Sequence, residues 1–383
     1  MADSSLPAGD AVALARALIA VDSRNPTLVP GAAGEREAAG LLATTLRRWG
    51  FDVDLTEAAP DRPNVVGRIG SGDHTLLLAG HLDTVGVEGM VHAPFDPGES
   101  EGRIYGRGSA DMKSGVAAMC AAALRSADTA RCRVIVAAVC DEEYESLGMR
   151  ALVGSGLMAD AAILTEPTRL AIAPAHHGFA WLTIRFRGKA AHGSRYDIGV
   201  DAIRHAGLFL AELESLDAHG LTSRTHPLLG RASVHASTIA GGEGFSTYPG
   251  ECVLRIERRT LPGESAEQVT NEVRELLTKV AARTPGLDAS VELVMAQSPS
   301  EVPETEPIVR ALASALASEG LPARIAGMSA WTDAAILNDA GIPAICFGPG
   351  DIGMAHAAEE FVEIAEIEQA TAVLERVVRE WTG

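Results

Sequence analysis

The sequence predicts an α/β protein in which one domain is inserted into another. Its 383 residues are enough for two domains, each with a core of its own. Apolar strands alternate with helices near both ends of the chain, which favours a mostly parallel sheet with helices on both faces. The middle of the chain instead follows the β-α-β-β-α-β order of a ferredoxin-like domain. We therefore expect one domain from residues 1–178 and 297–383, interrupted by a second from residues 179–296.

The outer domain is predicted from short apolar strands and from segments with helical spacing of apolar residues. The expected strands are Phe51–Leu55, Asn64–Ile69, Thr75–Ala79, Arg133–Val139, Ala161–Thr165 and Pro343–Phe347. The expected helices are Asp10–Val21, Glu35–Trp49, Ser114–Arg125, Leu147–Val153, Ile308–Glu319, Thr332–Ala340 and Ile364–Trp381. Because serine is a preferred N-cap residue, we expect Ser114 to cap its helix.

The inserted domain is predicted from four strands and two helices. The expected elements, in chain order, are Ala180–Arg187, Gly199–Leu213, Ala232–Ile239, Cys252–Arg259, Ala266–Ala282 and Ala289–Met295, of which the second and fifth are helices. A small sheet of this kind has two edge strands, and an exposed edge commonly pairs with a second copy of the chain. We therefore expect a homodimer formed through the inserted domain.

Composition excludes several classes of partner and location. With 51 acidic and 32 basic residues, the formal charge of −19 repels phosphate backbones and anionic membranes, so we expect neither nucleic acid nor membrane binding. The chain begins without a signal-peptide pattern, and no apolar run approaches the roughly 20 residues of a membrane span. Its 5 cysteines form no C-x-x-C pair and lie in apolar segments. Buried free thiols in the cytoplasm are the expected outcome.

Candidate metal ligands stand where the apolar strands end. His81 follows Thr75–Gly80, Glu142 and Glu143 follow the strand that ends near Cys140, and Glu166 follows Ala161–Thr165. His356 lies a few residues beyond the last strand, and Asp111 precedes the helix that starts at Ser114. In open α/β sheets, ligands bind beyond the carboxyl ends of the strands. These segments are therefore predicted to meet in one crevice.

Carboxylates gathered in one crevice repel each other and are costly to bury. Two divalent cations would offset both effects, with His81 and His356 supplying nitrogen and Asp111, Glu143 and Glu166 supplying oxygen. Mixed nitrogen and oxygen ligands suit zinc, with cobalt and manganese as alternatives. Five ligands serve two ions only if one carboxylate bridges them. An ion pair about 3.5–4 Å apart would hold a water between them and lower its pKa.

Several motifs together resemble one known family. They are Gly80–Val85 (GHLDTV), Gly106–Gly115 (GRGSADMKSG), Asp141–Glu143 (DEE), Thr165–Pro167 (TEP) and Gly348–Gly350 (GPG) followed by His356. This ordered set resembles the dinuclear zinc metallopeptidases and deacylases, the family of acetylornithine deacetylase, succinyl-diaminopimelate desuccinylase, aminoacylase and glutamate carboxypeptidase. The likeness covers nearly the whole chain and implies a catalytic domain interrupted by a lid domain that dimerises.

The resemblance implies a role for each residue of the metal centre. Asp111 would bridge two ions, His81 and Glu166 would complete one site, and Glu143 and His356 would complete the other. Glu142 resembles the general acid/base of the family. Asp83, two residues after His81, resembles the carboxylate that orients the imidazole of the ligand.

The resemblance also implies substrate contacts. His192, in Gly188–Ser194 (GKAAHGS), resembles the histidine that reaches the partner subunit's active site and hydrogen-bonds the oxyanion. Arg259 resembles the arginine that clamps a substrate carboxylate. Ser246 stands in a stretch where many members carry a substrate-binding asparagine, and Gly348 is the remaining position expected near the substrate.

These features predict a metal-dependent amidohydrolase that cleaves the amide bond of an N-acyl amino acid or a related small amide. A metal-bridged water would attack the carbonyl, with Glu142 as general acid/base. A carboxypeptidase or dipeptidase acting on short peptides is the alternative. A non-catalytic metal-dependent binding protein is a remote one, because no ligand and no base is missing. Glu166, where the dipeptidase and aminopeptidase branches use aspartate, favours the acylase and carboxypeptidase side.

The acyl group and the amino acid stay open at this point. Ser246, Tyr196 and the pair His176-His177 all depart from the residues that are frequent at these positions in the family. All of them lie in or near the inserted domain, so they affect the identity of the substrate and leave the metal chemistry unchanged.

Overall fold

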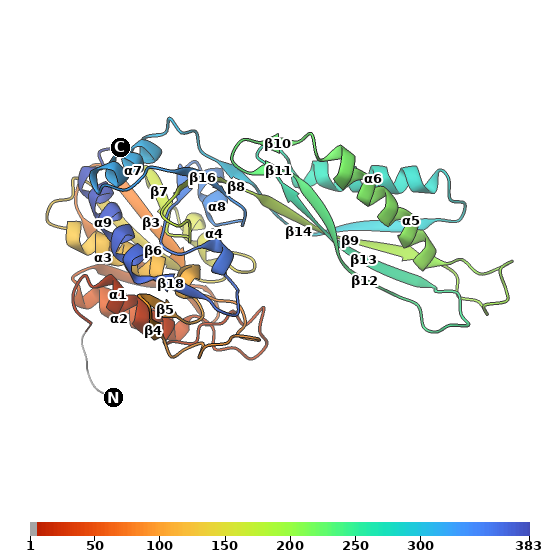
Figure 1. Cartoon of the computed structure of the whole chain (residues 1–383), viewed down its shortest axis with the longest axis horizontal. Helices are drawn as coiled ribbons and strands as arrows, with labels where there is room; N and C mark the ends of the chain where they lie inside the picture. Colours follow the sequence, from red (N-terminus) through yellow and green to blue (C-terminus); the bar gives the residue numbers. More distant parts are fainter. Residues whose placement is uncertain (1–5) are drawn as a thin grey trace. The chain divides into compact units, whose positions relative to one another are not determined.

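The computed structural model describes residues 6–383, and the chain divides into two units (Figure 1). The first unit comprises residues 6–174, 302–326 and 332–383, and the second comprises residues 175–301 and 327–331. Segments from both ends of the sequence therefore build the first unit, which appears in both red and blue in Figure 1.

The main sheet has a parallel centre and antiparallel flanks. Its strands, in order across the sheet, are β1 (Asp52–Ala59), β2 (Arg62–Gly70), β6 (Arg133–Val139), β3 (Thr75–His81), β7 (Ala161–Leu164), β17 (Ala344–Cys346), β8 (Ile172–His176) and β15 (Ser300–Glu301), and β16 (Ile325–Met328) pairs with β8. The four strands β6, β3, β7 and β17 run parallel, while β2 and β8 join them antiparallel on the two sides. The strands that carry the candidate ligands are thus the parallel ones.

Helices cover both faces of this sheet. One face packs against α1 (Ala11–Ile19), α2 (Arg36–Arg48), α3 (Ser114–Ser126), α7 (Pro307–Ser318) and α9 (Ile364–Glu380). The other face packs against α4 (Leu147–Gly154) and α8 (Ala334–Asp339). Strand alternation explains the arrangement, because Leu76 and Leu78 point into the larger core while Leu77, between them, is buried on the opposite side.

Two small sheets and three helical turns were not expected from the sequence. The first sheet pairs β4 (Gly98–Ser100), β5 (Arg103–Tyr105) and β18 (Phe361–Glu363), and the second pairs β10 (Thr225–His226) with β11 (Gly230–Arg231). The turns are Ser109–Lys113, Leu216–Gly220 and Ile352–Met354. Strands of two or three residues carry too few side chains to show an alternating pattern.

The second unit is a four-stranded antiparallel sheet with two helices. Its sheet order is β12 (Ser233–Gly241), β13 (Glu251–Thr260), β9 (Gly178–Arg187) and β14 (Asp288–Gln297), and its helices are α5 (Ala202–Ser215) and α6 (Ala266–Ala281). Both helices contact the sheet and each other, over a core that includes Phe186, Phe209 and Leu254. The chain order β9-α5-β12-β13-α6-β14 is the expected β-α-β-β-α-β order, and the predicted fold class is confirmed.

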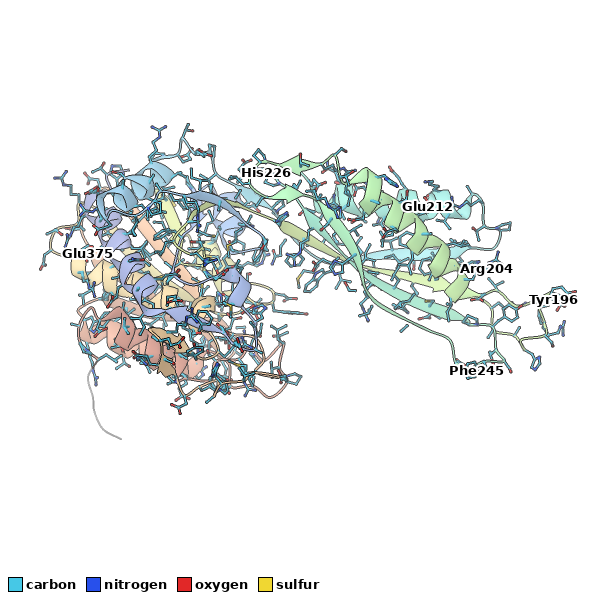
Figure 2. The ribbon with its side chains drawn as sticks, viewed as in Figure 1. Tyr196, Arg204, Glu212, His226, Phe245 and Glu375 are labelled. Atoms are coloured by element: carbon cyan, nitrogen blue, oxygen red, sulfur yellow. The ribbon has the colours of Figure 1, made fainter. Side chains whose placement is uncertain are left out.

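The second unit exposes apolar side chains along one strand and in two loops. β12 lies at the edge of its sheet, and Ile239 on it is 51% exposed. Tyr196 and Phe245 project from loops at the same end of this unit (Figure 2) and are 84% and 112% exposed. Scattered exposed apolar residues of this kind are normal on a protein surface.

Two expectations about single residues had different outcomes. The prediction that Ser114 caps its helix was wrong, because Ser114 is the first residue of α3 and the preceding Lys113 already has helical dihedral angles. The turn Ser109–Lys113 leads directly into the helix, so no separate cap is formed. The five cysteines are free and buried, as expected. No helix within residues 6–383 is long and apolar enough to cross a membrane.

Candidate metal centre

Three candidate ligands follow the carboxyl ends of neighbouring parallel strands. His81 is the last residue of β3, and Glu143 and Glu166 follow β6 and β7 by a few residues. The parallel register pairs His81 with Val139, the last residue of β6, so the two strands end at the same level. The sheet therefore brings these side chains together, because parallel strands deliver their carboxyl ends to one edge.

The other two candidate ligands come from loops. Asp111 lies in the turn Ser109–Lys113 before α3, is 8% exposed and is followed by a cis peptide bond to Met112. His356 follows the turn Ile352–Met354, is exposed, and has a φ of 61°. Their positions complete a set of two imidazoles and three carboxylates.

The five side chains form two groups that share Asp111. The ligand atoms of His81, Asp111 and Glu166 lie within 4.8 Å of one another, and so do those of Asp111, Glu143 and His356. His81 Nε2 is 3.1 Å from Asp111 Oδ1, whereas His356 Nε2 is 3.7 Å from Asp111 Oδ2 and 3.0 Å from Glu143 Oε2. The two oxygens of Asp111 thus face two different imidazoles, as a carboxylate that bridges two cations requires.

The negative charge of the carboxyl groups in the centre is not balanced by positive charge on neighbouring side chains. Burial, together with the charges of neighbouring carboxylates, raises the pKa of Glu142 and of Glu166 well above their ordinary values. Burial alone would lower the pKa of His81, but its hydrogen bond with Asp111 and the nearby charge of Glu142 raise it well above the ordinary value. The site therefore favours added positive charge.

The donor set fits divalent cations. Glu166 Oε1 is buried and has no hydrogen-bond partner among the described residues, so it keeps a free lone pair inside the site. His81 Nδ1 lies 2.9 Å from the Asp83 backbone carbonyl. A proton on Nδ1 that is donated to this carbonyl leaves Nε2, on the side of Asp111, as the ring atom that would bind a cation. Buried oxygen and nitrogen atoms with free lone pairs are the ligands expected for a divalent metal.

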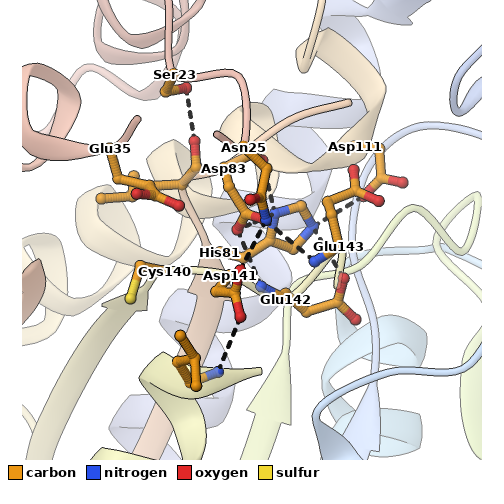
Figure 3. Close-up of polar contacts among 12 residues, drawn as sticks. Ser23, Asn25, Glu35, His81, Asp83, Asp111, Cys140, Asp141, Glu142 and Glu143 are labelled. Carbon is orange, nitrogen blue, oxygen red and sulfur yellow. Dashed lines mark hydrogen bonds and ion pairs between the residues drawn. The ribbon is translucent and has the colours of Figure 1, made fainter. Parts of the chain in front are cut away.

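Asp83 holds the backbone of the neighbouring ligand segment (Figure 3). Its two carboxylate oxygens accept hydrogen bonds from the amides of Glu142 and Glu143, each at 3.1 Å. Its backbone carbonyl, and not its carboxylate, makes the short contact with His81, whose Nδ1 is 3.6 Å from the carboxylate. Asp83 therefore orients the imidazole mainly through its main chain, and its side chain fixes Glu142 and Glu143.

A buried polar network behind Asp83 was missed by the sequence analysis. Asn25 Nδ2 donates to Asp83 at 2.9 Å and to Asp141 at 3.0 Å. Arg62 donates two hydrogen bonds of 2.6 Å to Glu35 and one of 3.0 Å to Asp141. All five side chains are buried. The network joins residues 27 to 116 positions apart, so no local spacing in the sequence indicates it.

Gly348 lies beside the Glu166 segment because the backbones approach closely there. A Cβ atom at residue 348 would lie 2.5 Å from the carbonyl oxygen of Thr165 and 2.7 Å from that of Glu166. The amide of Gly348 donates to Thr168 Oγ1 at 3.1 Å. The position requires glycine for packing against the strand end that carries Glu166.

The second unit carries the other three predicted site residues. His192 and Ser246 lie in neighbouring exposed loops, where the Gly193 amide donates to the Ser246 carbonyl at 2.7 Å and residue 192 forms an isolated bridge with Thr247. The His192 ring nitrogen Nδ1 lies 2.9 Å from Ser194 Oγ. The His192 loop follows the end of β9 at Arg187, and the Ser246 loop precedes the start of β13 at Glu251. The two loops meet because Arg187 and Glu251 are paired in the sheet.

Arg259 lies at the opposite end of β13. Its Nε donates to Glu257 Oε1 at 2.7 Å, and its guanidinium carbon is 5.6 Å from the centre of the Phe179 ring. Glu257 also accepts a hydrogen bond of 2.8 Å from Trp181 Nε1. Arg259 is therefore held by a carboxylate and an aromatic ring, on the strand but away from His192.

Comparison with known proteins identifies the family. The sequence profile of the peptidase family M20/M25/M40 matches residues 77–380. The acetylornithine deacetylase of Myxococcus xanthus is 32% identical over 378 residues, which cover 96% of each chain. The acetylornithine deacetylase of Vibrio cholerae serotype O1 is 30% identical over 382 residues, which cover 95% of this chain and 96% of the relative.

Solved structures of low sequence identity share the fold. The aminopeptidase PepT of Bacillus cereus superimposes with a TM-score of 0.80 at 19% identity, covering 98% of this chain and 99% of the other. YXEP of Bacillus subtilis, described as a dinuclear metal-binding peptidase, superimposes with a TM-score of 0.71 at 14% identity, covering 96% of each chain. The family expected from the sequence motifs is confirmed. The chain therefore belongs to the peptidase family M20/M25/M40, a family of enzymes that hydrolyse carbon–nitrogen bonds.

Proposed function

We propose that the protein is a metal-dependent amidohydrolase that removes the acyl group from an N-acyl amino acid or a related small amide. The observation that carries this proposal is the sharing of Asp111 between two ligand groups, with the carboxyl group of Glu142 3.9 Å from the ligand imidazole of His81. The full-length relatives of about 30% identity are named acetylornithine deacetylases, which supports deacylation over peptide cleavage.

The proposed metal centre uses the five residues of the two groups. His81, Asp111 and Glu166 would hold one ion, and Asp111, Glu143 and His356 would hold the other. We infer zinc as the most suitable metal from the mixed imidazole and carboxylate donors, with cobalt or manganese as substitutes. Such ions, when bound, polarise an amide carbonyl and lower the pKa of a bound water.

Glu142 is the residue that moves the proton in this proposal. It belongs to neither ligand group, although its Oε2 is 3.9 Å from His81 Nε2. Its backbone amide is fixed by Asp83, which sets the point of the loop from which the side chain extends. From this place the carboxylate accepts a proton from the attacking water and returns it to the leaving amine, the two steps of general acid–base catalysis.

Arg259 is proposed to bind the carboxylate of the substrate. Because Glu257 engages the Nε atom, the two terminal nitrogens remain for parallel hydrogen bonds to a carboxylate. Ser246 and Gly348 are proposed as further substrate-side positions. A carboxypeptidase or dipeptidase activity is the second candidate, favoured by the peptidases among the structural neighbours.

The test of the proposed reaction is replacement of Glu142. In Glu142→Ala we expect hydrolysis of N-acetyl amino acids to fall by at least about 10²–10⁴-fold, the usual contribution of a general acid–base group. Metal analysis should still find two ions per chain, because Glu142 is not a ligand. A panel of acetyl, succinyl, formyl and carbamoyl amino acids, with dipeptides as controls, would then identify the substrate. Retained hydrolysis in Glu142→Ala, or dipeptides as the only substrates, would contradict the proposal.

We also propose that the protein is a homodimer in which His192 acts in the partner subunit's site. β13 runs from Glu251 to Thr260, and nine steps of about 3.3 Å separate its ends by roughly 30 Å. His192 lies near the first end and Arg259 at the other. One small substrate cannot contact both residues of the same subunit. The exposed edge strand β12 supports pairing between two copies.

Mixed dimers test this arrangement. Glu142→Ala and His192→Ala should each be inactive alone, but dimers formed from both should contain one complete site. Random mixing would then restore about a quarter of the parent activity, because half of the dimers are mixed and each has one of two sites intact. No recovery after verified subunit exchange would contradict action across the dimer.

The five free, buried cysteines support the further proposal of a cytoplasmic location.

A further inference from the structure

Glu360 is a fully buried carboxylate that contacts the Asp111 loop. Its Oε1 accepts hydrogen bonds from the amides of Ala110 at 3.0 Å and Asp111 at 3.2 Å. Its Oε2 pairs with the guanidinium of Arg107, which is itself 3% exposed. Glu360 is four residues beyond His356, so this single side chain joins the two loops that supply candidate ligands.

The backbone around Glu360 is also fixed to the Asp111 segment. The Gly106 amide donates to the Glu360 carbonyl, and β18, which starts at Phe361, pairs with Tyr105 of β5. Arg107 is anchored in turn by a hydrogen bond of 2.8 Å from its Nε to the carbonyl of Gly86. Side chain and main chain therefore hold the same loop.

The contact repeats the arrangement seen at Asp83. Asp83 lies two residues after His81 and accepts the amides of Glu142 and Glu143, whereas Glu360 lies four residues after His356 and accepts the amide of Asp111. In both cases a segment that carries a candidate ligand also carries a buried carboxylate that holds the backbone of another such segment. A carboxylate with two amide donors is a strong and directional anchor.

We propose that Glu360, paired with Arg107, is a positioning residue that sets the place of the Asp111 carboxylate between the two cations. This inference rests on the proposed metal centre. Because Asp111 belongs to both ligand groups, a shift of its backbone weakens both sites. Groups that orient metal ligands typically contribute about 10–100-fold to metal affinity.

The experiment measures metal binding directly, without substrate. Metal-free parent protein, Glu360→Gln and Glu360→Asp are titrated with Co²⁺, whose visible spectrum reports ligand geometry. Glutamine loses the charge pair with Arg107, and aspartate keeps the charge but withdraws the oxygen from the amides. The matched control is Glu264→Gln in the second unit, because Glu264 also accepts a backbone amide, that of Leu261 at 2.9 Å, and pairs with a buried arginine, Arg258.

We expect both Glu360 variants to bind Co²⁺ about 10–100-fold more weakly with an altered spectrum, and Glu264→Gln to match the parent. Unchanged affinity in the Glu360 variants would overturn the proposal, and so would an equal loss in Glu264→Gln. The proposal would also be overturned if the Glu360 variants failed to fold without metal while Glu264→Gln folded without metal. The Glu360 side chain would then be needed for folding itself. A parent protein that binds no Co²⁺ would instead refute the proposed metal centre.

Discussion

At the scale of single residues, the buried carboxylates of the first unit perform two distinct tasks. Glu166 Oε1 has no hydrogen-bond partner among the described residues, whereas both carboxylate oxygens of Asp83 accept hydrogen bonds from backbone amides. The first arrangement suits a ligand and the second suits a residue that fixes a loop. The difference depends on which donors surround each group, since both are acidic residues next to strand ends.

Asp83→Asn is predicted to damage catalysis and metal binding together. Asparagine retains one acceptor oxygen, but its NH₂ group would face either an amide donor of the Glu142–Glu143 segment or the Nδ2 of Asn25, which is 2.9 Å away. We expect at least a 10-fold loss in metal affinity and a lower kcat. Metal titration and steady-state kinetics measure the two effects. Asp54→Asn, on the exposed strand β1, is the control and should match the parent; equal behaviour of both variants would contradict this role of Asp83.

Side chains at strand ends leave a local pattern in the sequence, and three of the five residues in the two ligand groups stand at such ends. His81 ends an apolar run and Glu166 follows another, so both could be recognised without a structure. Asn25, Arg62 and Glu360 could not, because each acts through contacts with segments far away in the chain. A buried charged residue cannot be told from a solvated one by its neighbours in sequence alone.

At the scale of elements, the close packing of helix α3 against the main sheet depends on a glycine. A Cβ atom at Gly115 would lie 1.9 Å from the carbonyl oxygen of Thr165, the residue before Glu166. The helix therefore packs directly against the end of β7, and its N-terminus borders the metal centre. Gly40 in α2 provides a contrast, since a Cβ there meets nothing within 4 Å.

These two glycines give opposite predictions. Gly115→Ala should lower the free energy of unfolding by about 1–3 kcal/mol, because the clash forces the β7 end and Glu166 to move. Gly40→Ala should raise it by about 0.5–1 kcal/mol, because alanine is the better helix former at an open position. Urea unfolding of both variants measures the difference. A stabilised Gly115→Ala variant would show that α3 does not pack as described.

An ion-pair cluster links β13 to the start of α6 in the second unit. Arg258 is 1% exposed and donates to Glu264 at 2.6 Å, and Arg224 donates to the same carboxylate at 3.1 Å. Burial alone would raise the pKa of Glu264, but the Leu261 amide and the Arg258 guanidinium bring it below the ordinary value. The folded state therefore binds the Glu264 proton more weakly than the unfolded state.

The pH dependence of this cluster follows from that direction. Stabilisation by Glu264 is fully present above the unfolded pKa of about 4.3 and is lost as the pH falls through the lower folded value. We expect Glu264→Gln to cost about 1.5–3 kcal/mol at neutral pH, with a difference from the parent that shrinks below about pH 4. Urea unfolding of both proteins across this range is the measurement. A difference that stays constant with pH would exclude this ion pair as the cause.

At the scale of the whole molecule, the two units have separate hydrophobic cores. One core includes Leu76 and Leu78 with the helices of the first unit, and the other includes Phe186, Phe209 and Leu254. All five candidate metal ligands belong to the first unit, while the exposed edge strand β12 belongs to the second. Metal binding and pairing between copies are therefore expected to stabilise different parts of the chain.

Calorimetry with and without a chelator tests this separation. Two metal ions, each at 100 times its Kd, stabilise the folded state by about 2.7 kcal/mol apiece, so chelation should lower the Tm of the first unit by roughly 10–20 °C. The transition of the second unit should not respond to the chelator but should rise with protein concentration if it forms the dimer. Gly115→Ala and Glu264→Gln assign the transitions, because each destabilises only one unit. A single transition that responds equally to the chelator and to both variants would show that the two units unfold together.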